Sequence, residues 1–361
     1  MKKIDRYIIW KYLSTFFYVA LIFSMVSMVI DFSEKVESFI AEPVTLYEIL
    51  VEYYLTFLLW INGLLWPLFA MIAVIFFTSR MAYNSEIISI LGAGISFRRI
   101  LLPYMIGASI ITLLLLFGDH YLIPLGNKYK LDFERAYIWK HNDKGKTKDV
   151  HMFIGPGEKI YVRFYKKLDS SAVDFRWEKF ENNQLTFMLK ARTAEWAGPP
   201  NNWRLKNYEI RTFDGMNESI LLGKGQTIDT SFNLRPSDFV RYLNQKEMMS
   251  TPALQQFIAE EQQKGIANTL VYEIEIHRRT ADPFTILILT ILGVSVASRK
   301  VRGGTGLHLA IGIIMGALFI FCSRFSVTFA TKQSIPPALG VWMPNIIFSL
   351  IAFYLLSRAQ K

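Results

Sequence analysis

The stretch WKYLSTFFYVALIFSMVSMVI, residues 10–30, contains a single charged side chain, Lys11. A helix needs about 20 mostly apolar residues to cross the hydrocarbon core of a bilayer. This stretch has that length, and no small-residue cleavage site follows it, which argues against a removable signal peptide. The sequence therefore predicts a transmembrane helix here.

Five further stretches have the same character. They cover about residues 54–77, 100–117, 283–297, 307–330 and 338–356. The chain as a whole is 52% hydrophobic and 19% charged, whereas soluble domains carry about 25% charged residues. We therefore predict a polytopic α-helical membrane protein with six transmembrane helices.

Lysines and arginines gather around every second connection between the predicted spans. They are Lys2, Lys3, Arg6, Lys11, Arg80, Arg98, Arg99, Arg299, Lys300, Arg302, Arg358 and Lys361. The connection after the first span is acidic instead, with Lys35 as its lone base. Because cytoplasmic loops carry an excess of Lys and Arg, we expect both termini in the cytoplasm of a multi-pass inner-membrane protein.

The residues between the third and fourth spans have a different pattern of apolar and polar residues. Alternating runs such as KIYVRFYKK (159–167) and WRLKNYEIRTF (203–213) predict strands, and turn clusters such as GPPNN (198–202) separate them. We expect spans one to three in residues 1–118, an inserted periplasmic all-β, jelly-roll-like domain in 119–279, and spans four to six in 280–361. Residues 235–265 read as a helical connector that includes a helix starting at Thr251–Pro252 and stopping at Gly265.

The connection SRMAYNSEIISILGAGISFRR, residues 79–99, predicts a short amphipathic helix over about 84–97. Asn84 is a candidate cap, and Glu86 lies in the first turn, where the helix dipole favours an anion. The expected apolar side consists of Ile87, Ile88, Leu91 and Ile95. Such a helix either docks into a groove of a soluble partner or rests on lipid.

Two segments carry a resemblance to a known family. SEIISILGAGISFRRILLP (85–103) and MMSTPALQQFIAEEQQKGIANTLVYEIEIHRRTADPF (248–284) resemble permeases of the lipopolysaccharide-export ABC transporter, the LptF/LptG (YjgP/YjgQ) family. That family pairs three helices, a periplasmic β-jelly-roll and three more helices, and this organisation matches essentially the whole chain. Whether the chain is F-like or G-like stays open.

The resemblance implies a permease subunit that extracts lipopolysaccharide from the inner membrane toward a periplasmic bridge. Its partners would be a sister permease subunit, a cytoplasmic ABC ATPase dimer and periplasmic jelly-roll bridge proteins. The partner ATPase would hydrolyse ATP, so this chain would bind no cofactor. Glu86, with Ser89 and Leu91, would belong to the coupling helix that contacts the ATPase.

Four basic residues outside the expected cytoplasmic loops are candidates for binding the lipid headgroup: Lys35, Arg278, Arg279 and Arg324. Phosphate and arginine form charge-assisted, often bidentate, hydrogen bonds. Arg324 lies within the fifth span, and the alternative there is snorkelling or a pair with Asp31 or Glu34. For Arg278 and Arg279 the alternative is neutralisation by Glu273 and Glu275.

Signatures of catalysis are missing from the sequence. No GxxxxGK[ST] phosphate loop, HExxH motif or GxSxG elbow occurs. The single Cys322 excludes an internal disulfide and a cysteine-built zinc site. The net charge of +10 does not point to nucleic acid, because the basic residues flank apolar spans.

The alternative function is a non-transporting membrane-anchored scaffold. The sequence lacks the polar residues that a membrane enzyme or a secondary transporter would require.

Overall fold

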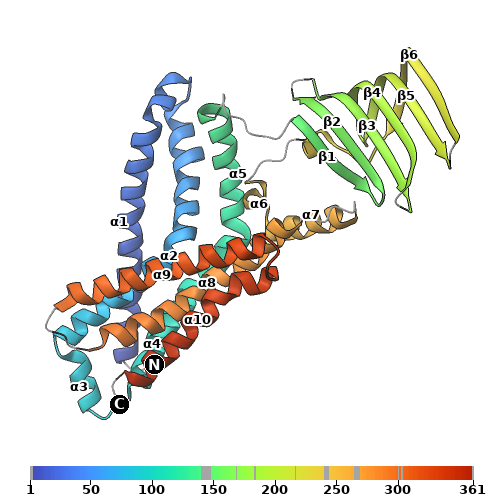
Figure 1. The fold of residues 1–361 in the computed structure, drawn as a ribbon. Coiled ribbons are helices and arrows are strands. Elements are labelled where there is room, and N and C mark those ends of the chain that lie inside the picture. The colour runs from blue at the N-terminus through green and yellow to red at the C-terminus, as the bar shows by residue number, and fades with distance from the viewer. Residues whose placement is uncertain are drawn as a thin grey trace. The chain divides into compact units, whose positions relative to one another are not determined.

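The computed structural model describes residues 3–139, 148–167, 169–182, 184–215, 217–239, 244–263, 269–299, 301 and 304–359. Lys2, Gly265, Lys300, Arg302 and Lys361 lie outside these ranges. The chain divides into two compact units. One is helical and comprises Met1–Lys140, Glu247–Thr251 and Leu270–Lys361; the other comprises His141–Lys246 and Pro252–Thr269 (Figure 1).

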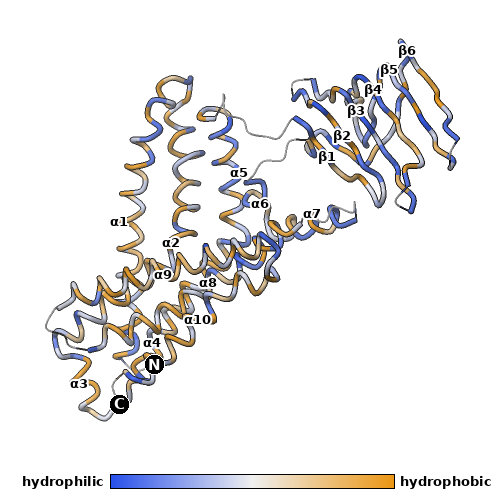
Figure 2. The backbone as a smooth tube through the Cα atoms, viewed as in Figure 1, coloured by the Kyte–Doolittle hydropathy of each residue, from blue (hydrophilic) through white to orange (hydrophobic). Residues whose placement is uncertain are grey.

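Among the described residues, the first unit contains six helices long and apolar enough to cross a membrane, which confirms the predicted number of spans. Figure 2 shows that they are predominantly hydrophobic along their length. They are α1 (Lys3–Ala41), α2 (Leu55–Tyr83) preceded by a π-helical stretch (Glu48–Tyr54), α4 (Phe97–Phe117), α8 (Leu270–Ala297), α9 (Gly304–Thr331) and α10 (Pro337–Arg358).

The third helical span continues well beyond its apolar segment. A π-helical turn (Gly118–Leu122) leads into α5 (Ile123–Phe133), and a second one (Glu134–Ile138) follows. Lys130 of α5 lies over the Trp60 ring of α2, with its ammonium 3.6 Å from the ring centroid. Tertiary contacts with α2 therefore keep this polar segment helical, although the apolar pattern alone predicted an end near residue 117.

Buried tyrosines link the helices in the core. The Tyr12 hydroxyl of α1 lies 2.9 Å from Thr290 Oγ1 of α8. Thr78 of α2 donates a hydrogen bond of 3.0 Å to the Tyr104 hydroxyl of α4. Each bond satisfies a polar atom that would otherwise be buried without a partner, so these contacts fix the helices relative to one another.

Ion pairs and hydrogen bonds join helix ends at the side of the unit where both termini lie (Figure 1). Arg99 at the start of α4 donates to both carboxylate oxygens of Asp5 in α1, at 2.9 and 2.7 Å. Arg299, after α8, donates to the backbone carbonyl of Arg358 at the end of α10. Basic residues that the sequence assigned to the same side of the membrane therefore contact helix ends at one end of the bundle.

In the part of the second unit that the structure describes, the strands form one six-stranded antiparallel sheet in the order β1-β2-β3-β4-β5-β6. Its strands are β1 (Lys148–Gly155), β2 (Glu158–Lys166), β3 (Ser171–Glu181), β4 (Gln184–Gly198), β5 (Asn202–Asp214) and β6 (Asn217–Ser231). The predicted all-β insert between two sets of helices is confirmed. The described strands follow each other as a meander, so each pairs with its neighbour in sequence.

One face of the sheet forms a core with the segment that follows β6. Phe232, Leu234 and Phe239 pack there against residues such as Phe175 and Trp203. The Trp203 indole donates a hydrogen bond of 3.0 Å to the Leu234 carbonyl. A 3-10 turn (Pro236–Phe239), α6 (Gln245–Met248) and α7 (Thr251–Gln263) follow, and α7 begins where the sequence predicted a helix start.

Candidate functional site

A short helix, α3 (Glu86–Gly92), lies in the connection between α2 and α4. Ile87 is 1% exposed in the core of the helical unit, and Ile90 and Leu91 pack against that core. Ile88 is 48% exposed, and Ser89 is also exposed. The contacts with the core follow positions 87, 90 and 91, so Ile87 and Leu91 of the expected apolar side are packed, whereas Ile88 is exposed.

The start of α3 also differs from the expectation. Asn84 is the C-cap of α2, and Ser85 precedes α3 with a left-handed φ of 62°. The Asn84 amide instead donates a hydrogen bond of 3.3 Å to Glu86 Oε1. Glu86 is half-buried, so part of its carboxylate stays accessible beside the exposed side of the helix.

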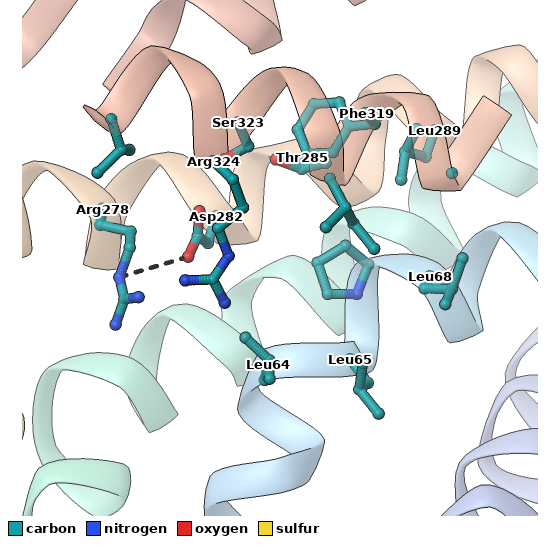
Figure 3. A pocket seen from close by; sticks show the side chains of 14 residues that line it. Leu64, Leu65, Leu68, Arg278, Asp282, Thr285, Leu289, Phe319, Ser323 and Arg324 are labelled. Carbon is teal, nitrogen blue, oxygen red and sulfur yellow. Dashed lines mark ion pairs between the residues drawn. The ribbon is translucent and has the colours of Figure 1, made fainter. Parts of the chain in front are cut away.

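A cavity of about 180 Å³ lies among α2, α8 and α9 (Figure 3). Its apolar wall includes Leu64, Leu68 and Phe319, and its polar wall includes Arg278, Asp282, Ser323 and Arg324. Arg278 Nε lies 3.9 Å from Asp282 Oδ2 on the next turn of α8. The cavity thus has a guanidinium–carboxylate pair and a second guanidinium at a largely apolar surface.

Arg324 reaches this cavity from α9. Figure 3 shows its side chain and that of Asp282 pointing into the same space from different helices. Among the described residues no ion pair joins Arg324 to Asp31 or Glu34, which were its expected alternatives; Asp31 instead pairs with Lys35 at 2.7 Å. Arg324 therefore has hydrogen-bond donors available to a ligand in the cavity.

The two adjacent arginines of α8 share one carboxylate. Glu275 Oε2 lies 3.1 Å from Arg278 Nη2, and Glu275 Oε1 lies 3.3 Å from Arg279 Nε. Arg279 is only 4% exposed and also donates to Thr251 Oγ1 at 3.1 Å. The alternative of neutralisation by Glu275 is found for both residues, and only Arg278 also lines the cavity.

Lys35 belongs to a separate polar cluster in the helical unit. Its ammonium lies 2.7 Å from Asp31 Oδ1 and 3.2 Å from Glu134 Oε1, and it also contacts the Tyr53 hydroxyl. Tyr53 in turn donates to Asp31 Oδ2 at 2.9 Å. Because an ammonium has three donors, this cluster occupies all of them.

The structure therefore brings together two of the four candidate headgroup residues, Arg278 and Arg324. Asp282 was not among the residues expected from the sequence, although its spacing of four residues from Arg278 on a helix was a usable signal. Glu134 was likewise not expected as a partner of Lys35, because nothing in the local pattern relates residues so distant in sequence.

Comparison with known proteins agrees with this architecture. The family model described as "Lipopolysaccharide export system permease LptF/LptG" matches residues 6–358. No curated protein matches the chain. The family match spans both sets of helices and the β unit between them. The chain therefore belongs to the LptF/LptG family of lipopolysaccharide export system permeases.

Proposed function

We propose that this chain is a permease subunit that extracts lipopolysaccharide from the inner membrane toward a periplasmic bridge, driven by a separate ATPase. The family match supports the transport role. The observation that carries the coupling step is α3, which is anchored by Ile87 and presents Ile88 and Ser89 outward. A short helix with one buried and one free side suits docking into a partner's groove.

In this proposal both termini and α3 are cytoplasmic, and a cytoplasmic ABC ATPase dimer contacts Glu86 and Ser89. Leu91 transmits the contact, because it packs against the same core as Ile87. A tightly packed core passes on a displacement instead of absorbing it. Nucleotide binding then biases the permease between two states of its lipid cavity.

The lipid headgroup is held by Arg278 and Arg324 in the cavity among α2, α8 and α9. A phosphate there would accept charge-assisted hydrogen bonds from the guanidinium groups, while Leu64, Leu68 and Phe319 of the same cavity suit apolar parts of the lipid. Arg279 and Lys35 position neighbouring charged groups, and either would have to exchange its carboxylate partner before it touched a headgroup. A sister permease subunit would complete the lipid path between the first and fifth spans.

The β unit would pass the lipid to periplasmic jelly-roll bridge proteins. Among the described strands β1 and β6 are the two edges of the sheet. An edge strand has unpaired backbone groups, so it can pair with a strand of another chain.

The test is purification of the tagged, full-length protein in mild detergent, comparing the wild type with Glu86→Lys. The wild type should recover a P-loop ATPase and a second six-span protein, and Glu86→Lys should lose the ATPase alone. Glu37→Lys is the matched control, because Glu37 is exposed in the acidic connection expected on the other side of the membrane. A non-transporting scaffold predicts instead that Glu86→Lys keeps full function in cells.

A further inference from the structure

A second cavity, of about 230 Å³, lies where α1, α2 and α3 approach one another. Its polar lining includes Lys11 of α1, Arg80 of α2, Asn84 and Glu86, together with the hydroxyl-bearing Tyr7 and Thr15 of α1. Phe76 and Phe77 contribute apolar surface. Neither the coupling step nor the lipid path proposed above uses Lys11 or Arg80.

The charged groups of this cavity are held apart. Within the described ranges neither Lys11 nor Arg80 forms an ion pair, and the Glu86 side chain accepts a hydrogen bond from Asn84 at 3.3 Å. Arg99 differs from Lys11 and Arg80 in this respect, because its guanidinium forms two hydrogen bonds with the Asp5 carboxylate, at 2.9 and 2.7 Å. Two cations and one carboxylate therefore face a space large enough for a small polar group.

The surroundings place this space at the depth of lipid headgroups. Trp10, next to Lys11, is 65% exposed, and Tyr83, at the end of α2, is 63% exposed. Exposed Trp and Tyr at the ends of spans are typical of the membrane–water interface. Phe76, which lines the cavity, is 45% exposed and so offers apolar surface that an acyl chain can cover.

The charge arrangement selects among headgroups. Arginine binds phosphate through its planar fork, and lysine acts as a point charge beside it. A carboxylate at the same site repels a simple anion but attracts a primary ammonium, which donates charge-assisted hydrogen bonds. A headgroup that carries a phosphate and a primary ammonium on one short linker satisfies all three groups.

We propose that this cavity binds the headgroup of a phosphatidylethanolamine lipid from the leaflet on the α3 side. Its phosphate lies against Arg80 and Lys11, and its ammonium lies against the Glu86 carboxylate. The bound lipid ties α3 to α1 and α2. This ligand is additional to the transported lipid. It shares Glu86 with the proposed coupling contact, whereas Lys11 and Arg80 serve the bound lipid alone.

The test is native mass spectrometry of the full-length protein in detergent, with added lipids of identical acyl chains. Phosphatidylethanolamine should be retained at least about tenfold better than phosphatidylcholine, whose trimethylated nitrogen donates no hydrogen bond, because a hydrogen bond to a charged group contributes about 1.5–3 kcal/mol. Phosphatidylethanolamine should also be retained better than phosphatidylglycerol, whose headgroup carries no ammonium. Equal retention of the three lipids by the wild type overturns the proposal without any variant.

Variants separate the roles of the lining residues. Lys11→Gln and Arg80→Gln should each lower retention of phosphatidylethanolamine about tenfold, and Glu86→Gln should abolish its advantage over phosphatidylglycerol. Arg98→Gln is the matched control, because Arg98 is an exposed arginine in the first turn of α4 that does not line the cavity. This variant should retain the lipid at the wild-type level. If Glu86→Gln keeps the preference, or if inorganic phosphate displaces the lipid fully, the assignment is wrong. The readout is lipid retention, so failure here leaves the proposed coupling role of Glu86 untouched.

Discussion

The arginines of α8 and α9 differ in how their charges are balanced. An arginine at the centre of a span costs about 2.5–3.5 kcal/mol on insertion scales. Arg279 is buried against Glu275, and Arg278 contacts both Glu275 and Asp282. Arg324 has no ion pair among the described residues and lines a cavity. Contacts within the protein therefore do not account for a charged residue at position 324, whereas binding of an anionic ligand in the cavity does.

Replacing Arg324 by Gln should reduce retention of lipopolysaccharide by the purified protein about tenfold, because a charge-assisted contact to phosphate is lost. Its exposed side chain means that the free energy of unfolding should change by less than about 0.5 kcal/mol. Lys332→Gln, an exposed cation just beyond α9, is the control and should retain the lipid normally. Equal retention by both variants would remove Arg324 from the site.

Removal of the Lys35 ammonium should have a structural effect. Lys35→Met leaves Asp31 and Glu134 close together without their shared cation, and breaking a buried pair in this way costs about 3–5 kcal/mol. Thermal unfolding in detergent should show the loss of stability. A variant of normal stability that no longer retains lipopolysaccharide would show instead that Lys35 binds the headgroup directly.

Among the elements, the six spans followed from the sequence because apolar length is a local property. The polar extensions of two of these helices could not be predicted in the same way. The Trp60 ring stabilises α5, and the Glu275–Arg279 ion pair stabilises the first turns of α8. In the same way, the exposed position of Ile88 depends on which side of α3 meets the core. No local pattern distinguishes Ile87 from Ile88 in that respect.

The packing of α10 against α9 depends on a glycine. A Cβ at Gly340 would lie 2.4 Å from Ala330 Cβ and 3.3 Å from the Ser326 carbonyl oxygen. Neither group is a flexible chain end, so Gly340→Ala should lower the free energy of unfolding by about 1–3 kcal/mol. Gly306→Ala in α9 is the control, because no described atom lies within 4 Å of its Cβ position. Similar stability of the two variants would contradict this packing.

The β6 edge offers apolar surface to a partner. Ile220, Leu221 and Leu222 are 53%, 57% and 58% exposed. If the bridge protein adds a strand here, Leu221→Lys should abolish its co-purification, because burying one such side chain contributes about 1.5–3 kcal/mol. Phe153→Lys on β1, where the side chain is 42% exposed, should not. Loss of the bridge with Phe153→Lys alone would assign the contact to the opposite edge.

At the scale of the whole molecule, the order of helical and β segments could be predicted because composition changes abruptly between them. The pairing order of the strands could not, because a period of two defines the faces of a strand but not its neighbours. The meeting of Arg278, Asp282 and Arg324 likewise required the packing of α8 beside α9. Sequence therefore supplied candidate residues, and tertiary structure decided which of them share a site.

The proposed export function requires α3 and the β unit to lie on opposite sides of the membrane. Single cysteines at Ser89 and Lys224, both exposed, can be introduced after replacing Cys322, and intact cells treated with a maleimide that does not cross the inner membrane. We expect labelling at position 224 and none at position 89 until the membrane is permeabilised. Labelling at position 89 with none at 224 would invert the topology and contradict the proposed coupling to a cytoplasmic ATPase.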